Sequence, residues 1–152
     1  MSANLFPTFE VPAVLPEDEE ITERYLPAPM FDFETGEFVT DGARRTLYGS
    51  GYDAWVLWCI KTVMTQRWAH LGYSSNAGIE AEEAFQEPDR NAQESMFERT
   101  ITEALLADPK GRTIQVRDFI FIREVDGLRL SCVIVGVEGD TATITARLNN
   151  LE

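Results

Sequence analysis

The sequence predicts an α+β domain in which an antiparallel sheet of three or more strands packs against two main helices, preceded by an extended acidic arm. Three observations support this class of fold. An apolar helical stretch follows Ser50, a second stretch over residues 92–107 has a one-sided apolar stripe, and three β-rich runs near the C-terminus are separated by short turns that contain glycine. Packing helices on one face of a sheet is an economical way to bury these apolar surfaces together.

The first helix is the most apolar part of the chain and is expected to be central. Ser50 can cap it by accepting a hydrogen bond from the amide of Asp53, and the carboxylate of Asp53 can bond back to the cap amide. The helix should therefore begin at Gly51, and its apolar pattern continues to Trp68, a length of about 18 residues. Polar residues interrupt its second half, so we reject a membrane-spanning reading.

The second helix is predicted over Ala92–Ala107, with Asn91 and Glu94 as its capping signal. Its stripe should pack with the first helix on the sheet. We expect a common core formed by apolar side chains of both helices and the sheet: Trp55, Trp58, Val63, Phe97, Ile101, Leu105, Phe119, Phe121, Cys132 and Ile134.

The C-terminal third reads as an antiparallel meander of strands at 113–125, 128–137 and 141–148. A short hairpin around Thr35-Gly36 is also predicted, from the alternation over residues 31–38. In a simple meander the third strand is an edge. From Thr141 to Ala146 it carries no proline and no charge that would discourage pairing, so either a partner strand or the N-terminal hairpin or arm of this chain should cover it.

Residues 1–30 form the predicted arm, and residues 31–152 form a single α+β domain. Five prolines lie between Leu5 and Pro29, an acidic block spans residues 17–20, and no helical or strand period is visible. Phe6 and Phe9 belong to a set of apolar residues too numerous for a solvated linker, so they are candidate binding residues. The arm could dock on another protein or wrap its own domain, and the sequence favours neither.

Composition excludes several classes of partner. The 26 acidic and 13 basic residues give a net charge of −13, which repels nucleic acid and anionic membranes. Cys59 and Cys132 fit buried apolar positions better than a disulfide, which favours a reducing compartment. No secretory signal is visible at the N-terminus, so we expect synthesis and use from the cytoplasm.

Patterns for catalysis or cofactors are weak. His70 is the single histidine, so neither a histidine metal site nor a catalytic triad is expected. The spacing of Gly49, Gly51 and Ala54 lacks the βαβ context of a dinucleotide site, and no cofactor is predicted. The acidic cluster over residues 80–89 leaves a glycosidase as the least favoured alternative.

Several segments in order resemble the small baseplate wedge proteins of contractile phage tails and prophages, whose members are often labelled lysozyme-like. The matching segments are Phe31-Asp-Phe-Glu-Thr-Gly36, Thr65-Gln-Arg67, Tyr73-Ser-Ser-Asn-Ala-Gly-Ile-Glu80, Ile101-Thr-Glu-Ala-Leu-Leu-Ala-Asp108 and Val116-Arg-Asp-Phe-Ile-Phe121. Many relatives have a compact acidic-proline-arginine tripeptide after the second helix. Here Lys110-Gly111 separates Asp108-Pro109 from Arg112.

The resemblance implies a structural, non-enzymatic wedge component that helps to start the contractile sheath. It implies that Asp108 and Arg112 contact a wedge partner, and that extended arms of sheath subunits pair along Thr141, Thr143 and Thr145. Expected partners are other wedge proteins and sheath subunits, with the tail tube or hub as further possibilities and several copies in each baseplate. The expected location is the virion tail, after synthesis in the host cytoplasm. The runner-up is an acidic regulatory binder, since a similar fold is known in a bacterial anti-adaptor protein.

Overall fold

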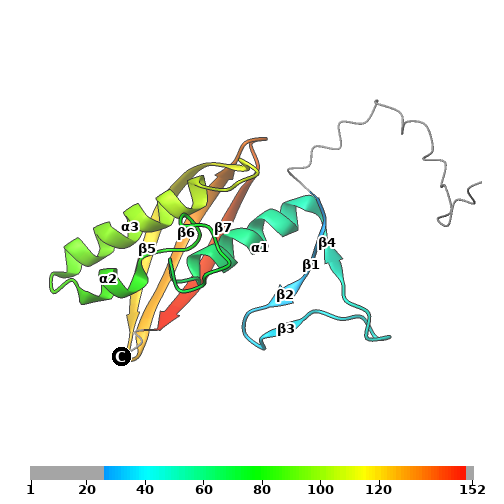
Figure 1. The fold of residues 1–152 in the computed structure, drawn as a ribbon, viewed down its shortest axis with the longest axis horizontal. Coiled ribbons are helices and arrows are strands. Elements are labelled where there is room, and N and C mark those ends of the chain that lie inside the picture. The colour runs from blue at the N-terminus through cyan, green and yellow to red at the C-terminus, as the bar shows by residue number, and fades with distance from the viewer. Residues whose placement is uncertain (1–25, 150–152) are drawn as a thin grey trace, which may run out of the picture.

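A computed structural model describes residues 26–149 (Figure 1). Within them, the helices lie on one face of a three-stranded sheet, and a smaller region of short strands stands beside the N-terminal end of the first helix. The α+β class is confirmed, with three helices rather than two. Most of the predicted arm, including Phe6 and Phe9, lies outside the described residues.

The main sheet is formed by β5 (Thr113–Glu124), β6 (Gly127–Gly136) and β7 (Thr141–Asn149) in the order β5-β6-β7. All neighbours are antiparallel, so the predicted meander is confirmed. Buried residues alternate with more exposed ones along β6 and β7, as expected when one face of a sheet packs on helices and the other faces solvent. The helix α1 packs mainly against β7, and α3 packs against β5.

Helix α1 (Gly51–Val63) begins as predicted. The Ser50 hydroxyl accepts from the amide of Asp53 at 3.3 Å, and Asp53 accepts from the amide of Ser50 at 3.0 Å. Its predicted end at Trp68 is wrong, since the helix stops at Val63. The chain turns because Thr65 and Arg67 exchange backbone hydrogen bonds with Ile79, a tertiary pairing that helical periodicity does not encode.

Trp68 shows the consequence of this early end. It has φ 63° and is 62% exposed, so it does not continue the buried stripe of α1. Ile79, which the helical pattern could not identify, is fully buried.

Helix α2 spans Ala81–Gln86 and helix α3 spans Arg90–Leu106. The predicted cap at Asn91 is wrong. Asp89 caps α3 instead, because its Oδ2 accepts from the amide of Ala92 at 2.9 Å and its own backbone is extended.

The core lies between α1, α3 and the inner face of the sheet. Seven of the ten predicted core residues are buried, whereas Trp58, Phe119 and Phe121 are only half-buried. Trp58 lies on the side of α1 that faces a groove, and Phe119 lies within the irregular segment of β5 between Arg117 and Ile120. The sheet contributes further buried side chains that the core prediction omitted: Leu128, Leu130, Ile144, Ala146 and Leu148.

The smaller region has two antiparallel pairs. Strand β1 (Ala28–Pro29) pairs with β4 (Tyr48–Gly49), and β2 (Phe31–Asp32) pairs with β3 (Glu37–Phe38). The hairpin predicted around Thr35-Gly36 is confirmed. The Asp32 carboxylate accepts from the amide of Glu34 at 2.8 Å, and this hydrogen bond holds the pKa of Asp32 below its ordinary value.

Candidate partner-binding site

The free edge of β7 is the first component of the site. The register of β6 and β7 runs without a shift from the Gly127–Asn149 pair to the Val135–Thr141 pair. Beyond it, the Gly136 amide donates to the carbonyl of Asp140 at 2.7 Å. Because hydrogen-bonded pairs alternate in an antiparallel ladder, the backbone of Ala142, Ile144, Ala146 and Leu148 faces β6.

Consequently the backbone N–H and C=O groups of four alternate residues of β7 lie in the plane of the sheet and point away from β6. These residues are Thr141, Thr143, Thr145 and Arg147. All four side chains are exposed. The hydroxyl of Tyr52 donates to the outward carbonyl of Thr141 at 3.0 Å. Within residues 26–149, no strand pairs with this edge, so the hairpin predicted as its cover is not there.

The opposite edge, at β5, has a different character. Its register with β6 shifts between Arg117 and Ile120, and Asp118 lies in this irregular segment with φ 56°. Charged, exposed side chains at Arg117 and Asp118 accompany the shift. Bulges and charges of this kind discourage the addition of a strand. The described sheet therefore has one protected edge and one regular edge.

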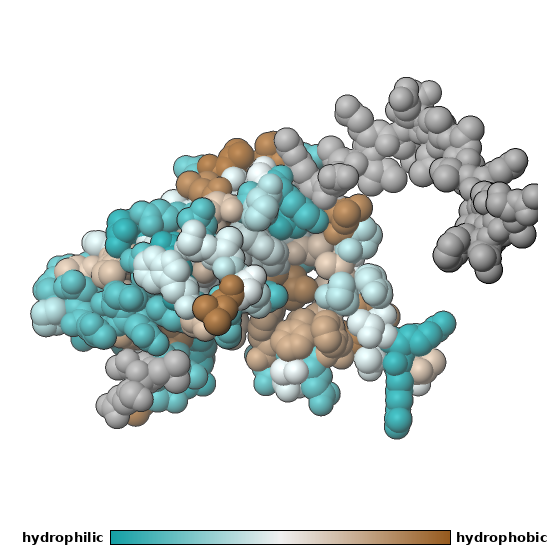
Figure 2. Space-filling view, in the orientation of Figure 1, coloured by the Kyte–Doolittle hydropathy of each residue, from teal (hydrophilic) through white to brown (hydrophobic). Residues whose placement is uncertain are grey.

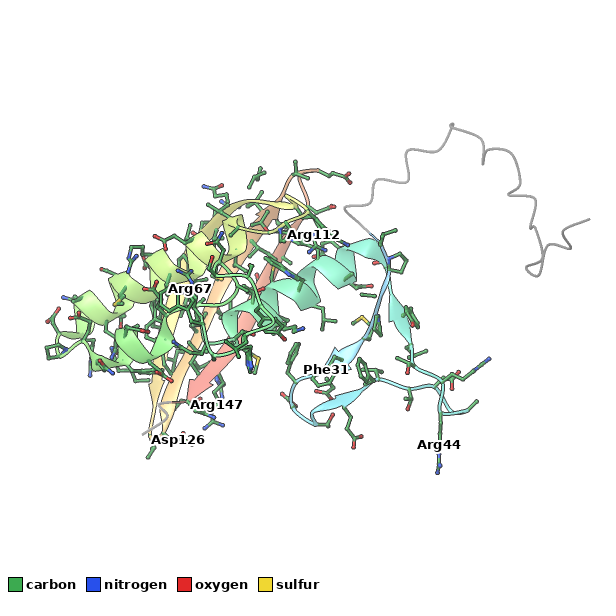
Figure 3. All side chains as sticks on the ribbon, in the orientation of Figure 1. Phe31, Arg44, Arg67, Arg112, Asp126 and Arg147 are labelled. Carbon is green, nitrogen blue, oxygen red and sulfur yellow. The ribbon has the colours of Figure 1, made fainter. Side chains whose placement is uncertain are left out.

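An ion-pair cluster fixes the C-terminal end of β7. Arg147 Nε lies 2.8 Å from Glu124, and its Nη2 lies 2.8 Å from Asp126 in the β5–β6 turn; Figure 3 shows Arg147 and Asp126 at the same end of the sheet. The hydrogen bond to Asp126 raises the pKa of Arg147. These contacts hold the end of the edge strand against the rest of the sheet.

Asp108 and Arg112 form the second component. Arg112 Nε donates to Asp108 Oδ2 at 2.7 Å, and Nη2 donates to Oδ1 at 3.2 Å. The Asp108 side chain is 1% exposed and the Arg112 side chain is 5% exposed. Gly111, with φ 61°, lets the intervening residues turn, so the two-residue separation still yields a closed pair.

This pair is built into the domain. The Arg112 guanidinium lies 5.4 Å from the centre of the Trp58 ring, and the carbonyl of Arg112 accepts from the amide of Val137 at 2.8 Å. The next residue, Thr113, accepts from the indole of Trp55 at 2.9 Å. Because the two charges compensate each other and are shielded from water, the pair can fix the shape of the loop that precedes β5.

A groove lies beside this loop, and we call it the hairpin groove. Figure 2 shows hydrophobic side chains gathered between the short-stranded region and the helical body. The volume is about 720 Å³, in the range typical of ligand pockets. It is lined by the chain before β2, by β2 and its hairpin, by α1 and by the loop after α3: Leu26, Pro27, Ala28, Pro29, Phe31, Phe33, Phe38, Ala54, Leu57, Trp58, Lys61, Asp108, Pro109, Lys110 and Arg112.

The other candidate chemical groups are engaged or sequestered. Glu80, in the acidic cluster, lies 2.9 Å from Arg67 and 3.6 Å from Arg99. Burial raises the pKa of Cys59 and of Cys132 to about 12, which keeps them as thiols. In the described part of the chain, no three His, Cys, Asp or Glu side chains are grouped as metal ligands. No helix there is long and apolar enough to cross a bilayer.

Together, the fold and the edge describe a small α+β domain whose sheet has one regular edge strand without a pairing strand among residues 26–149. The sequence matches the profile of the contractile injection system sheath initiators over residues 29–139, so the chain belongs to that family. A search of curated proteins finds no match. The matched span includes the Asp108–Arg112 loop and ends before β7. Family membership assigns a structural role related to the sheath of a contractile injection system, in a phage tail or baseplate assembly.

Proposed function

We propose that the protein is a baseplate wedge component that nucleates the sheath by offering the edge of β7 to an extended arm of a sheath subunit. The observation that carries this proposal is the contrast between the two edges. The β7 edge keeps a continuous register, whereas the β5 edge is shifted and charged. A regular open edge is the surface on which β-augmentation operates.

The chemistry of this docking is backbone hydrogen bonding. An added strand would pair with the outward groups of Thr143, Thr145 and Arg147, which lie on alternate residues. The threonine side chains, branched at Cβ, favour an extended neighbour on the same face. Membership in the sheath initiator family supports a sheath subunit as the owner of that strand.

The Asp108–Arg112 loop and the arm are assigned to contacts inside the baseplate. The buried pair fixes the shape of the loop, so its contribution to a wedge partner is indirect, through Pro109 and Lys110 at the surface of the hairpin groove. Other wedge proteins are the proposed neighbours, with the tail tube or hub as further ones, and several copies act in each baseplate. Association with a sheath family supports this assembly role over a regulatory binder.

Proline scanning tests strand addition, because proline removes one donor and the direction of that donor differs between neighbours. Thr143→Pro removes an outward donor. We expect this variant to keep the circular dichroism spectrum of the parent and to give tail tubes without sheath in electron micrographs. The matched control is Ala142→Pro, which removes a donor of the ladder that faces β6 and should therefore destabilise the domain.

Thr145→Pro provides a second outward position if Thr143→Pro fails to fold. A folded outward variant on particles with normal sheath would rule out strand addition at β7. Folded protein that is absent from the particles would instead show a defect in wedge incorporation, which the proposal does not predict for this edge.

A further inference from the structure

The hairpin groove exposes apolar surface that a soluble domain normally covers. Phe38 is 55% exposed and Leu26 is 42% exposed, while Phe31, Leu57 and Trp58 are half-buried around the same hollow. Its volume of about 720 Å³ would otherwise hold on the order of twenty water molecules against aromatic and aliphatic walls. An exposed apolar surface of this kind usually marks a site where another chain segment or a ligand binds.

Chain continuity supplies the nearest candidate. Leu26, the first described residue, lines the groove, and so do Pro27, Ala28 and Pro29 after it. The 25 residues before Leu26 therefore join the domain at the wall of the groove. Phe9 is 17 residues upstream of Leu26, a separation that an extended chain spans with up to about 56 Å, far more than is needed to fold back.

The charges of residues 1–25 and of the groove are complementary. Residues 1–25 contain six acidic residues and one arginine. The whole sequence has only two lysines, Lys61 and Lys110, and both line the hairpin groove. Among residues 26–149, neither lysine forms an ion pair, whereas most of the arginines there do.

We infer that residues 1–25 occupy the hairpin groove of their own chain in the free protein. The apolar side chains around Phe6 and Phe9 fill the space between β2 and α1, and the acidic block at residues 17–20 lies near Lys61 and Lys110. The inference is independent of strand addition at β7, which uses another surface of the domain.

Paramagnetic broadening in the full chain tests this directly. A nitroxide is attached to Thr8→Cys; Cys59 and Cys132 are buried thiols and should stay unlabelled. We expect loss of the amide signals of Phe38, Leu57 and Lys110, with no loss at Asp126 in the distant β5–β6 turn. The same label on Asp126→Cys is the control and should spare the groove.

Two further variants separate docking from tethering. Phe6→Ser with Phe9→Ser, in the labelled chain, should restore most groove signals although the tether is unchanged. Lys61→Glu with Lys110→Glu should do the same, whereas Arg117→Glu at the β5 edge should not. Absence of groove broadening, or persistence of broadening in the serine variant, would overturn the inference. Broadening seen only when label and isotope reside on different molecules would also overturn it, by showing that the arm docks on a second copy.

Discussion

Arg112 closes on Asp108 through two side-chain hydrogen bonds, and the pair is almost entirely shielded from water. Removing one partner of a buried pair leaves an uncompensated charge, which destabilises proteins by about 3 to 5 kcal/mol. Asp108→Asn should therefore lower the free energy of unfolding by about that amount in urea melts. Arg45→Gln is the control, because the Arg45 side chain in its pair with Asp41 is 81% exposed and the pair should contribute less than about 1 kcal/mol. A change below about 1 kcal/mol for Asp108→Asn would show that the pair does not hold the loop.

Phe97 is fully buried on α3, with its ring 5.1 Å from that of Phe85 and 6.4 Å from that of Phe121. Phe97→Ala should lower the free energy of unfolding by about 3 to 5 kcal/mol, since it removes apolar contact and leaves a cavity. That is a large share of a total stability of roughly 5 to 15 kcal/mol. Val125→Ala, at a fully exposed side chain in the β5–β6 turn, is the control and should change the value by less than about 1 kcal/mol. Equal losses in the two variants would contradict the packing of α3 on the sheet.

The two thiols give a prediction on pH. Burial raises the pKa of Cys59 and of Cys132 from the ordinary value of 9.0 to about 12. The folded state thus keeps its protons between pH 9 and 12 while the unfolded state loses them. This contribution to stability is fully present below pH 9 and falls above it, by up to about 1.4 kcal/mol per pH unit for each thiol.

Measurement of this effect needs a thiol-free reference, because other groups also titrate in that range. Cys59→Ala with Cys132→Ala should show a shallower decline of unfolding free energy above pH 9 than the parent. At pH 8, the native parent should not react with a thiol reagent, and urea should release two reactive thiols. Rapid reaction of the native protein would refute the burial of these cysteines.

Deletion of residues 1–25 should leave a folded domain, because residues 26–149 already supply a continuous core between α1, α3 and the sheet. The deletion stops at Tyr25 so that the pairing of Ala28–Pro29 with Tyr48–Gly49 is kept. We expect an unchanged circular dichroism spectrum and a midpoint of thermal unfolding within a few degrees of the parent, together with impaired baseplate assembly. Failure of the truncated chain to fold would place the arm inside the domain and remove the proposed division at residue 30.

The sequence by itself determined most local structure, because the signals for these elements act between near neighbours. The capping box of Ser50 and Asp53, the turns at Gly36 and Gly127, and the period-two alternation of β6 and β7 each follow from a few adjacent residues. The stretch of β7 from Thr141 to Ala146, which carries no proline and no charge, was also visible in the sequence. The family could be suspected because short segments kept their order along the chain.

Tertiary contacts decided the remainder. Helix α1 ends at Val63 because Ile79, 16 residues away, takes the hydrogen bonds of Thr65 and Arg67. The family resemblance implied that Asp108 and Arg112 contact a wedge partner, whereas the structure pairs them with each other across a left-handed Gly111 and buries them beside Trp58. The hairpin groove is likewise formed by residues up to 86 positions apart in sequence, from Leu26 to Arg112. Local patterns carry no information on such pairings, because the free energy that selects them comes from burial and charge compensation between distant segments.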